Sequence, residues 1–137
     1  MIVVDTNILL YSTFQLSEPA LAAKARALMI AEPRWILPGL WRHEYLNALC
    51  TYIRVGGLST DEAWGYFAQA LAAYSDHECP VEMNRALELS QQLGLSGYDA
   101  QFVALAEASN VLLITEDKRL LKAVGGRAMS MEQRLKH

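Results

Sequence analysis

The sequence predicts an α/β fold, a three-layer sandwich in which a mostly parallel central sheet is flanked by helices. Short apolar runs alternate along the chain with longer segments of helical periodicity, which is the pattern of strand–helix–strand units. The run at 111–114 is apolar at four consecutive positions. Such a run is typical of a strand that is buried on both faces, as in a parallel sheet.

The first half of the chain contains two candidate strands and three candidate helices. The strands are 2–4 and 35–37, and the helices are 17–32, 40–56 and 60–74. Ser17 is a suitable N-cap for the first helix, with Pro19 in its first turn. Pro38-Gly39 opens the second helix, which Gly56-Gly57 ends. Ser59-Thr60-Asp61-Glu62 is a capping-box sequence at the start of the third.

The second half contains three further helices and two strands. The helices are 81–93, 97–110 and 118–124, and the strands are 111–114 and 128–131, the last at a sheet edge. Ser96-Gly97-Tyr98-Asp99 has the capping-box form. We expect residues 1–131 to form a single domain and the polar residues 132–137 to be a frayed C-terminal tail.

Composition limits the classes of function. A length of 137 residues suits one domain, and a net charge of −3 argues against binding nucleic acid through bulk basic charge. An enzyme with an acidic site around a cation remains compatible with this charge. No apolar stretch reaches the ~20 residues of a membrane helix. Cys50 and Cys79 lie outside any CxxC motif, so we expect two reduced thiols and a cytoplasmic location.

Four acidic residues are expected at one edge of the sheet. Asp5 directly follows the first candidate strand, and Asp117 comes shortly after the strand at 111–114. The carboxyl ends of parallel strands share the edge at which open α/β sheets bind ligands. Asp99 begins the helix that leads into strand 111–114, and Glu44 lies near the start of its helix, at the margin of the apolar face. The four carboxylates are therefore predicted to converge.

Carboxylates that converge without basic partners repel one another and raise one another's pKa. A bound divalent cation relieves this repulsion. Ligands that are all oxygen, with no His or Cys close in sequence to three of the four acids, suit Mg²⁺ or Mn²⁺ better than Zn²⁺.

Each acid also has a simpler structural explanation. Asp5 could begin an Asx-turn, Asp99 could stabilise a helix start, and Asp117 could be an N-cap. Glu44 could be a surface acid. Only their joint placement favours a metal site, and Asp117, which has the strongest capping explanation, is expected to be the most dispensable of the four for metal binding.

Four blocks of the sequence resemble PIN-domain nucleases, in order and over nearly the whole chain. These are 3–10 (VVDTNILL), 44–49 (EYLNAL), 98–100 (YDA) and 113–117 (LITED). The strongest similarity is to the VapC toxins of bacterial and archaeal toxin–antitoxin pairs.

The resemblance implies that Asp5, Glu44, Asp99 and Asp117 hold one or two Mg²⁺ or Mn²⁺ ions and are the catalytic residues. The polar groups that would support them are Thr6, Asn7, Asn47 and Thr115, with Thr115 orienting a carboxylate or water. The implied reaction is hydrolysis of an RNA phosphodiester bond by a metal-activated water. A homodimer and a cognate antitoxin are the implied protein partners.

Basic residues adjoin the acids in the sequence. Arg42 precedes Glu44 by two positions, and Lys118 and Arg119 follow Asp117, so all three could hold phosphates that flank the cleaved bond. Ordinary solvated helix charges are the alternative. We expect His43 to be a surface residue.

The helix at 60–74 is rich in aromatic residues, namely Trp64, Tyr66, Phe67 and Tyr74. Most of them are expected in the core. Excess aromatic surface on a small protein often marks a protein interface, which agrees with the expected dimer.

Two other classes of function are alternatives to the nuclease. One is a non-catalytic, metal-stabilised module that binds RNA or protein. The other is a receiver-like phosphoryl-transfer domain, which the sequence disfavours because Thr115-Glu116-Asp117 follows the strand at 111–114 where a receiver would place a Lys. No P-loop or GxGxxG motif supports a nucleotide-binding enzyme.

Overall fold

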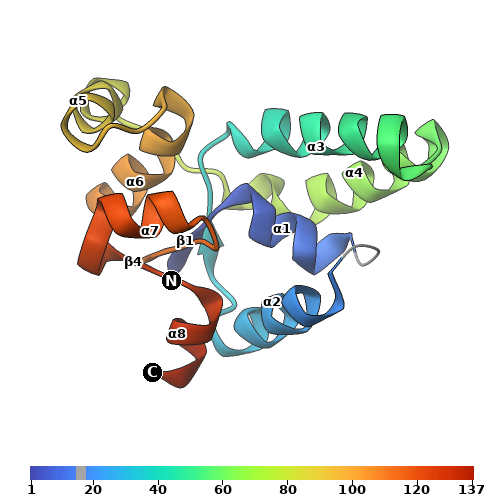
Figure 1. Ribbon diagram of the computed structural model, residues 1–137, viewed down its shortest axis with the longest axis horizontal. Helices are drawn as coiled ribbons and strands as arrows, with labels where there is room; N and C mark the ends of the chain where they lie inside the picture. The colour runs from blue at the N-terminus through green and yellow to red at the C-terminus, as the bar shows by residue number, and fades with distance from the viewer. Residues whose placement is uncertain (15–17) are drawn as a thin grey trace.

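A parallel sheet of four short strands lies at the centre of the computed structural model, which describes residues 1–14 and 18–137 (Figure 1). The strands are β1 (Ile2–Val4), β2 (Trp35–Ile36), β3 (Leu113–Ile114) and β4 (Ala128–Met129). Their order is β2-β1-β3-β4, and each neighbouring pair is parallel. Val4 is in register with Ile114, so the carboxyl ends of β1 and β3 lie side by side.

Helices cover both faces of the sheet. They are α1 (Thr6–Thr13), α2 (Pro19–Ala31), α3 (Trp41–Gly56), α4 (Thr60–Tyr74), α5 (Met83–Leu93), α6 (Gly97–Ser109), α7 (Lys118–Val124) and α8 (Met131–Lys136), with 3₁₀ turns η1 (Ser75–His77) and η2 (Gly125–Arg127). None of these helices is long and apolar enough to cross a membrane.

Two separate hydrophobic clusters confirm the predicted three-layer architecture. Helices α1, α2, α3, α4 and α8 pack on one face of the sheet, and α5, α6 and α7 pack on the other. Successive side chains of a strand point to opposite faces. Ile2 and Val4 therefore join the first cluster and Val3 joins the second.

Most predicted elements are present, some with shifted bounds. Helix α7 spans the predicted residues, and the Ser59 capping box begins α4. Strand β3 is limited to the last two residues of the predicted run at 111–114, and α5 begins at Met83 instead of 81. Ser17, the predicted N-cap of α2, lies outside the described residues.

Helix α1 is absent from the sequence-based prediction, which ends β1 in a turn. Its first residues, Thr6 and Asn7, are weak helix formers, and the side chain of its N-cap Asp5 makes no capping hydrogen bond. Burial of Ile8 and Leu9 in the first cluster stabilises the helix instead. Tertiary packing thus outweighs a poor local signal.

The prediction that residues 132–137 form a frayed tail is wrong. Ser130 and Gln133 form a capping box that begins α8, which also ends the predicted edge strand at Met129. Met131 is completely buried, and Arg134 forms an ion pair with Glu32, the C-cap of α2. Helix α8 therefore packs on α2 as part of the first layer.

Candidate active site

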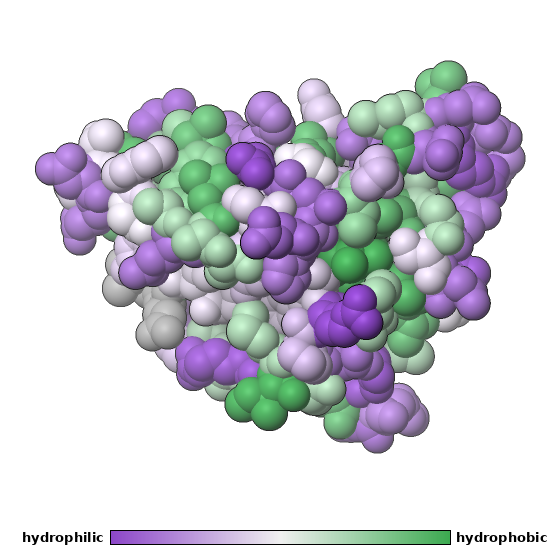
Figure 2. Space-filling model, turned by 180° about the vertical axis from the view of Figure 1, so that it is seen from behind, coloured by the Kyte–Doolittle hydropathy of each residue, from purple (hydrophilic) through white to green (hydrophobic). Residues whose placement is uncertain are grey.

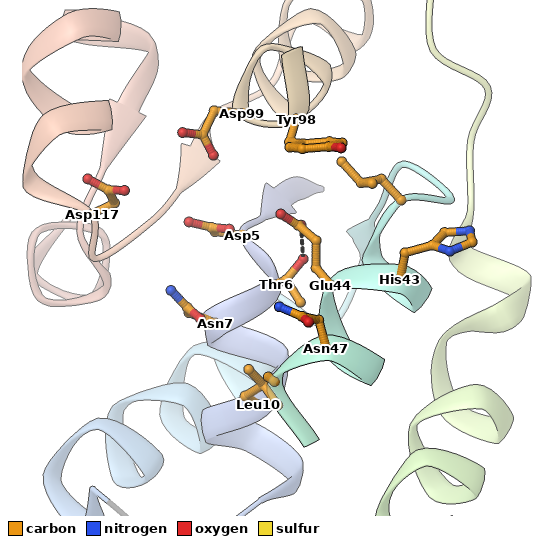
Figure 3. A pocket seen from close by; sticks show the side chains of 12 residues that line it. Asp5, Thr6, Asn7, Leu10, His43, Glu44, Asn47, Tyr98, Asp99 and Asp117 are labelled. Atoms are coloured by element: carbon orange, nitrogen blue, oxygen red, sulfur yellow. Dashed lines mark hydrogen bonds between the residues drawn. The ribbon is translucent and has the colours of Figure 1, made fainter. Parts of the chain in front are cut away.

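A pocket of about 500 Å³ opens at the carboxyl edge of the sheet, among α1, α3, α6 and the start of α7 (Figure 3). Twelve described residues line it: Asp5, Thr6, Asn7, Leu10, Leu40, His43, Glu44, Asn47, Ala48, Tyr98, Asp99 and Asp117. All four carboxylates that the sequence singles out are among them.

Each carboxylate reaches the pocket from a different element. Asp5 follows β1, and its backbone N–H donates to the carbonyl of Ile114 at 2.9 Å, which ties it to the end of β3. Asp117 is the N-cap of α7, and Asp99 lies in the first turn of α6. Glu44 lies in the first turn of α3. The strand ends and helix starts therefore bring together residues that are far apart in the sequence.

Two threonine hydroxyls orient two of the carboxylates. Thr6 Oγ1 donates to Glu44 Oε1 at 2.7 Å. Thr115 Oγ1 donates to Asp5 Oδ2 at 2.8 Å and accepts from the backbone N–H of Asp117 at 3.1 Å. Both threonines are buried, Thr115 completely. The structure therefore contains the contact by which Thr115 was expected to orient a carboxylate.

Burial is the main reason that the pKa of Asp5, of Glu44 and of Asp99 is raised. The carboxylates also raise one another's pKa: Asp99 acts on both Asp5 and Glu44, and Asp117 acts on Asp5 and Asp99. Hydrogen bonds from Thr115 and Thr6 lower the pKa of Asp5 and Glu44 in part. The pocket is therefore a buried, crowded set of acids.

The N-cap interpretation of Asp117 is confirmed. Its Oδ1 accepts from the backbone N–H of Arg119 at 2.9 Å and from that of Leu120 at 3.2 Å. Asp117 is also the most solvent-exposed of the four acids. The Asp117 carboxylate therefore caps a helix, which the carboxylates of the other three acids do not.

The four carboxylates of the pocket are chemically suited to bind a hard divalent cation. Across residues 1–14 and 18–137, no group of three or more His, Cys, Asp or Glu side chains is arranged to hold a metal ion as it stands. The pocket nevertheless combines four carboxylates with raised pKa values at three of them, and its described lining contains no Lys or Arg. Oxygen donors with excess negative charge suit Mg²⁺ or Mn²⁺.

Comparison with known families identifies the fold. The family description "PIN domain" matches residues 2–126. This chain belongs to the PIN-domain family. Its PIN domain is 30% identical over 84 residues to Exonuclease VapC9 from Pyrobaculum aerophilum, an alignment that covers 61% of this chain and 62% of that relative. The alignment thus spans less than two thirds of the relative's length.

Solved structures share the fold of this PIN domain. PAE2754 from Pyrobaculum aerophilum superimposes with a TM-score of 0.75 at 24% identity, covering 98% of this chain and 93% of that one. A toxin–antitoxin complex from Klebsiella pneumoniae gives a TM-score of 0.69 at 18% identity, covering 96% and 98%. FitAcB from Neisseria gonorrhoeae gives 0.69 at 13% identity, covering 96% and 99%.

None of the three basic residues expected at the rim, Arg42, Lys118 and Arg119, is among the described residues that line the pocket. Arg42 does not line the pocket, because its guanidinium forms an ion pair with Glu78. Lys118 and Arg119 are exposed in the first turn of α7, and the charge of Arg119 lowers the pKa of Asp99 against the larger effect of burial. His43 lines the pocket, but its exposed ring points away from the acids (Figure 3), in agreement with a surface residue.

The sequence-based prediction of the site does not include several residues that line the pocket. Leu10 reaches the pocket only because α1 forms, and α1 itself was not predicted. Tyr98 was treated as part of a helix start, although its position beside Asp99 was a usable signal. Asn7 and Asn47, expected as supporting groups, do line the pocket.

The aromatic helix α4 divides as expected between core and surface. Tyr74 is buried and Tyr66 and Phe67 pack against the first cluster, whereas Trp64 is 62% exposed. Trp64 borders an apolar groove of about 200 Å³ between α3 and α4, together with Leu46, Leu49, Cys50, Ile53, Thr60, Ala63 and Phe67. From behind, the surface shows separate hydrophobic patches divided by hydrophilic residues (Figure 2).

Proposed function

We propose that this PIN domain is a metal-dependent endoribonuclease. The observation that carries the proposal is the convergence of four carboxylates on one pocket, with burial and mutual repulsion raising the pKa of three of them. A group of acids that is unfavourable by itself becomes favourable around a cation. The likeness to a relative named as an exonuclease supports nuclease chemistry.

Asp5, Glu44 and Asp99 are the residues that we propose as the principal metal ligands, with Asp117 beside them. A bound Mg²⁺ or Mn²⁺ would lower the pKa of a coordinated water and offset the charge on the attacked phosphate. Thr115 and Thr6 hold Asp5 and Glu44 in position through hydrogen bonds. No side-chain nucleophile is required.

The decisive experiment uses a circular single-stranded RNA with Mg²⁺ or Mn²⁺. An endonuclease opens the circle, whereas an exonuclease, the activity in the relative's name, leaves it intact. We expect the wild type to open the circle and Asp5→Asn and Asp99→Asn to lose at least about 100-fold of the rate, as is usual when a transition-state contact is removed. Asp117→Asn is expected to weaken metal binding less than either.

Asp76→Asn is the matched control, because it removes an exposed carboxylate of η1 outside the pocket. Equal cleavage by the wild type and the two site variants would indicate a contaminating nuclease and refute the proposal. Cation-dependent thermal stabilisation without cleavage would instead favour the non-catalytic binding module.

We further propose that the protein is a cytoplasmic toxin that forms a homodimer and binds a cognate antitoxin. The shared fold with a chain solved as a toxin–antitoxin complex supports the antitoxin, and the exposed Trp64 beside the α3–α4 groove supports the dimer. Light scattering after gel filtration tests the dimer, which Trp64→Ala is expected to weaken. A monomeric wild type would contradict it. Co-purification with the product of the adjacent gene tests the antitoxin.

A further inference from the structure

The walls of the acidic pocket contain little that attracts phosphate. Among the described residues that line it are four acids, while Lys and Arg are missing from that lining. A phosphodiester backbone that approaches these acids is repelled except where a cation intervenes. The walls themselves are therefore better suited to the uncharged parts of a nucleotide, which are the base and the sugar.

Tyr98 provides an aromatic ring, and any nucleic-acid base can stack on the face of such a ring. Tyr98 is 63% exposed, and its ring lies at the pocket beside Asp99 and Glu44 (Figure 3). Within the described part of the chain, the Tyr98 side chain makes no contact with another aromatic ring and no hydrogen bond. Trp64 is equally exposed, yet its ring packs edge-on against Phe67 at 6.1 Å. The Tyr98 ring is therefore free to stack on a ligand.

The backbone beneath Tyr98 is fixed. Tyr98 lies in the first turn of α6, where the Ser96 hydroxyl accepts from the backbone N–H of Asp99 at 3.0 Å. Ala100, two residues further on, is completely buried. A rigid backbone loses little conformational entropy when its side chain binds a ligand. The backbone of Tyr98 is thus held in place one residue from a proposed metal ligand, while its ring remains accessible.

The opposite part of the pocket has groups suited to the edge of a base. Asn7 on α1 and Asn47 on α3 both line it, and their amides can donate and accept hydrogen bonds (Figure 3). Tyr98 and these amides border the same cavity of about 500 Å³ as the acids. A nucleotide with its phosphate at the acids therefore has its base within the same pocket.

We propose that Tyr98 is the base-stacking residue of this site, on whose ring one unpaired base beside the cleaved bond stacks. This inference rests on the proposed ribonuclease function. Bases inside a duplex are already stacked on their neighbours and cannot offer a face to Tyr98 without being extruded. Stacking on aromatic side chains is a common way to bind single strands without a strict sequence preference.

The test compares Tyr98→Ala and Tyr98→Phe on a linear single-stranded RNA and on the same RNA with an abasic ribose beside the mapped cleavage site. We expect Tyr98→Ala to raise KM about 5- to 100-fold on the intact RNA, the effect of losing one stacked base, with a much smaller change in kcat. Tyr98→Phe keeps the ring and is expected to stay close to wild type. On the abasic RNA, Tyr98→Ala and wild type should have the same KM.

Leu87→Ala is the matched control, since Leu87 is 65% exposed on α5 and lies outside the pocket. An unchanged KM for Tyr98→Ala, or the same rise in KM on intact and abasic RNA, would overturn the stacking role. Absence of cleavage by the wild type would refute the proposed function alone. Binding of labelled oligouridine, followed by fluorescence anisotropy, then decides the role of Tyr98: weaker binding by Tyr98→Ala supports it, and equal or absent binding overturns it.

Discussion

Two buried threonine hydroxyls position half of the acidic set. Thr115 links Asp5 to the backbone of Asp117, and Thr6 holds Glu44. Groups that orient metal ligands are commonly worth a factor of about 10 to 100 in metal affinity or activity. These two side chains therefore belong to the working site even though both are buried behind the acids.

Thr115→Val is expected to lower metal affinity and cleavage about 10- to 100-fold while the fold persists, because valine keeps the shape and loses the hydroxyl. Thr115→Ser should restore most of the loss. Thr13→Val is the control, since the Thr13 hydroxyl, on α1 and outside the pocket, donates to the Leu9 carbonyl and hydrogen-bonds the Tyr45 hydroxyl. Cleavage rates and Mn²⁺ titration measure these effects. Equal losses of cleavage and Mn²⁺ affinity in Thr115→Val and Thr13→Val would contradict a positioning role for Thr115.

Asp5 should destabilise the folded protein at neutral pH. Burial raises its pKa above the ordinary value of 3.8, so the folded state binds this proton more tightly than the unfolded state. The destabilisation grows as the pH rises from that ordinary value through the raised pKa, and it is complete above the raised pKa.

Asp5→Asn is therefore expected to raise Tm in EDTA at about pH 7.5 by about 2 to 8 °C, the effect of 1 kcal/mol in domains of this general size. The advantage over wild type should shrink at a second, acidic pH below the raised pKa of Asp5, because the carboxyl is then protonated in the folded state. Thermal unfolding at the two pH values measures it, with Asp76→Asn as the control. A Tm difference that is constant with pH would contradict this account.

Local sequence patterns predicted that the four acids converge, but they did not predict all of the residues around them. Strand ends and helix starts can be inferred from local patterns, and these determine where Asp5, Asp99 and Asp117 lie. The position of the Arg42 guanidinium depends on its ion pair with Glu78, a partner 36 positions away that no local pattern reveals. Side-chain partners of this kind are settled only by tertiary structure.

At the scale of elements, the two errors concern helices that are stabilised by packing. Helix α1 has weak helix formers at its start, and α8 has only six residues, so neither has a strong periodic signal. Both are held by buried residues of the first cluster, Ile8 and Leu9 in α1 and Met131 in α8. The one local pattern that indicates α8 is its capping box of Ser130 and Gln133, which the sequence-based prediction does not include.

Met131→Ala is expected to lower the free energy of unfolding by about 2 to 5 kcal/mol, the usual effect of emptying a buried methionine site. Leu135→Ala, on the same short helix but 38% exposed, should have a much smaller effect. Urea unfolding compares the two variants with wild type. Small and equal effects would mean that α8 does not contribute to the core and that residues 132–137 behave as the frayed tail predicted from the sequence.

At the scale of the whole molecule, the pocket joins elements from both layers. Carboxylates after β1 and on α3 meet carboxylates at the starts of α6 and α7. The alternation of strands and helices predicted the three layers, but the strand order β2-β1-β3-β4 depends on long-range pairing that local patterns do not encode. The pocket edge could be predicted without that order, since all parallel strands end on the same side.

A cation that binds across the pocket should therefore stabilise the entire fold. Mn²⁺ at about 100 times its Kd is expected to add about 2.7 kcal/mol to the stability of the wild type, and a clear rise in Tm should result. Asp5→Asn and Asp99→Asn should show little rise, while Asp76→Asn should respond like wild type. Thermal unfolding with and without Mn²⁺ makes the comparison, and an equal rise in all variants would indicate binding elsewhere.

The hydrogen bond from Thr115 to Asp5 spans 110 positions of the sequence. Asp5 is synthesised before Thr115 and Asp117, so a chain whose synthesis has not yet reached these two residues lacks two sides of the acidic pocket. Any activity of this pocket must wait until translation has passed these residues. Under the proposed ribonuclease function, a chain that is stalled or truncated before Thr115 is expected to leave the RNA around it intact, including the message from which it is being made.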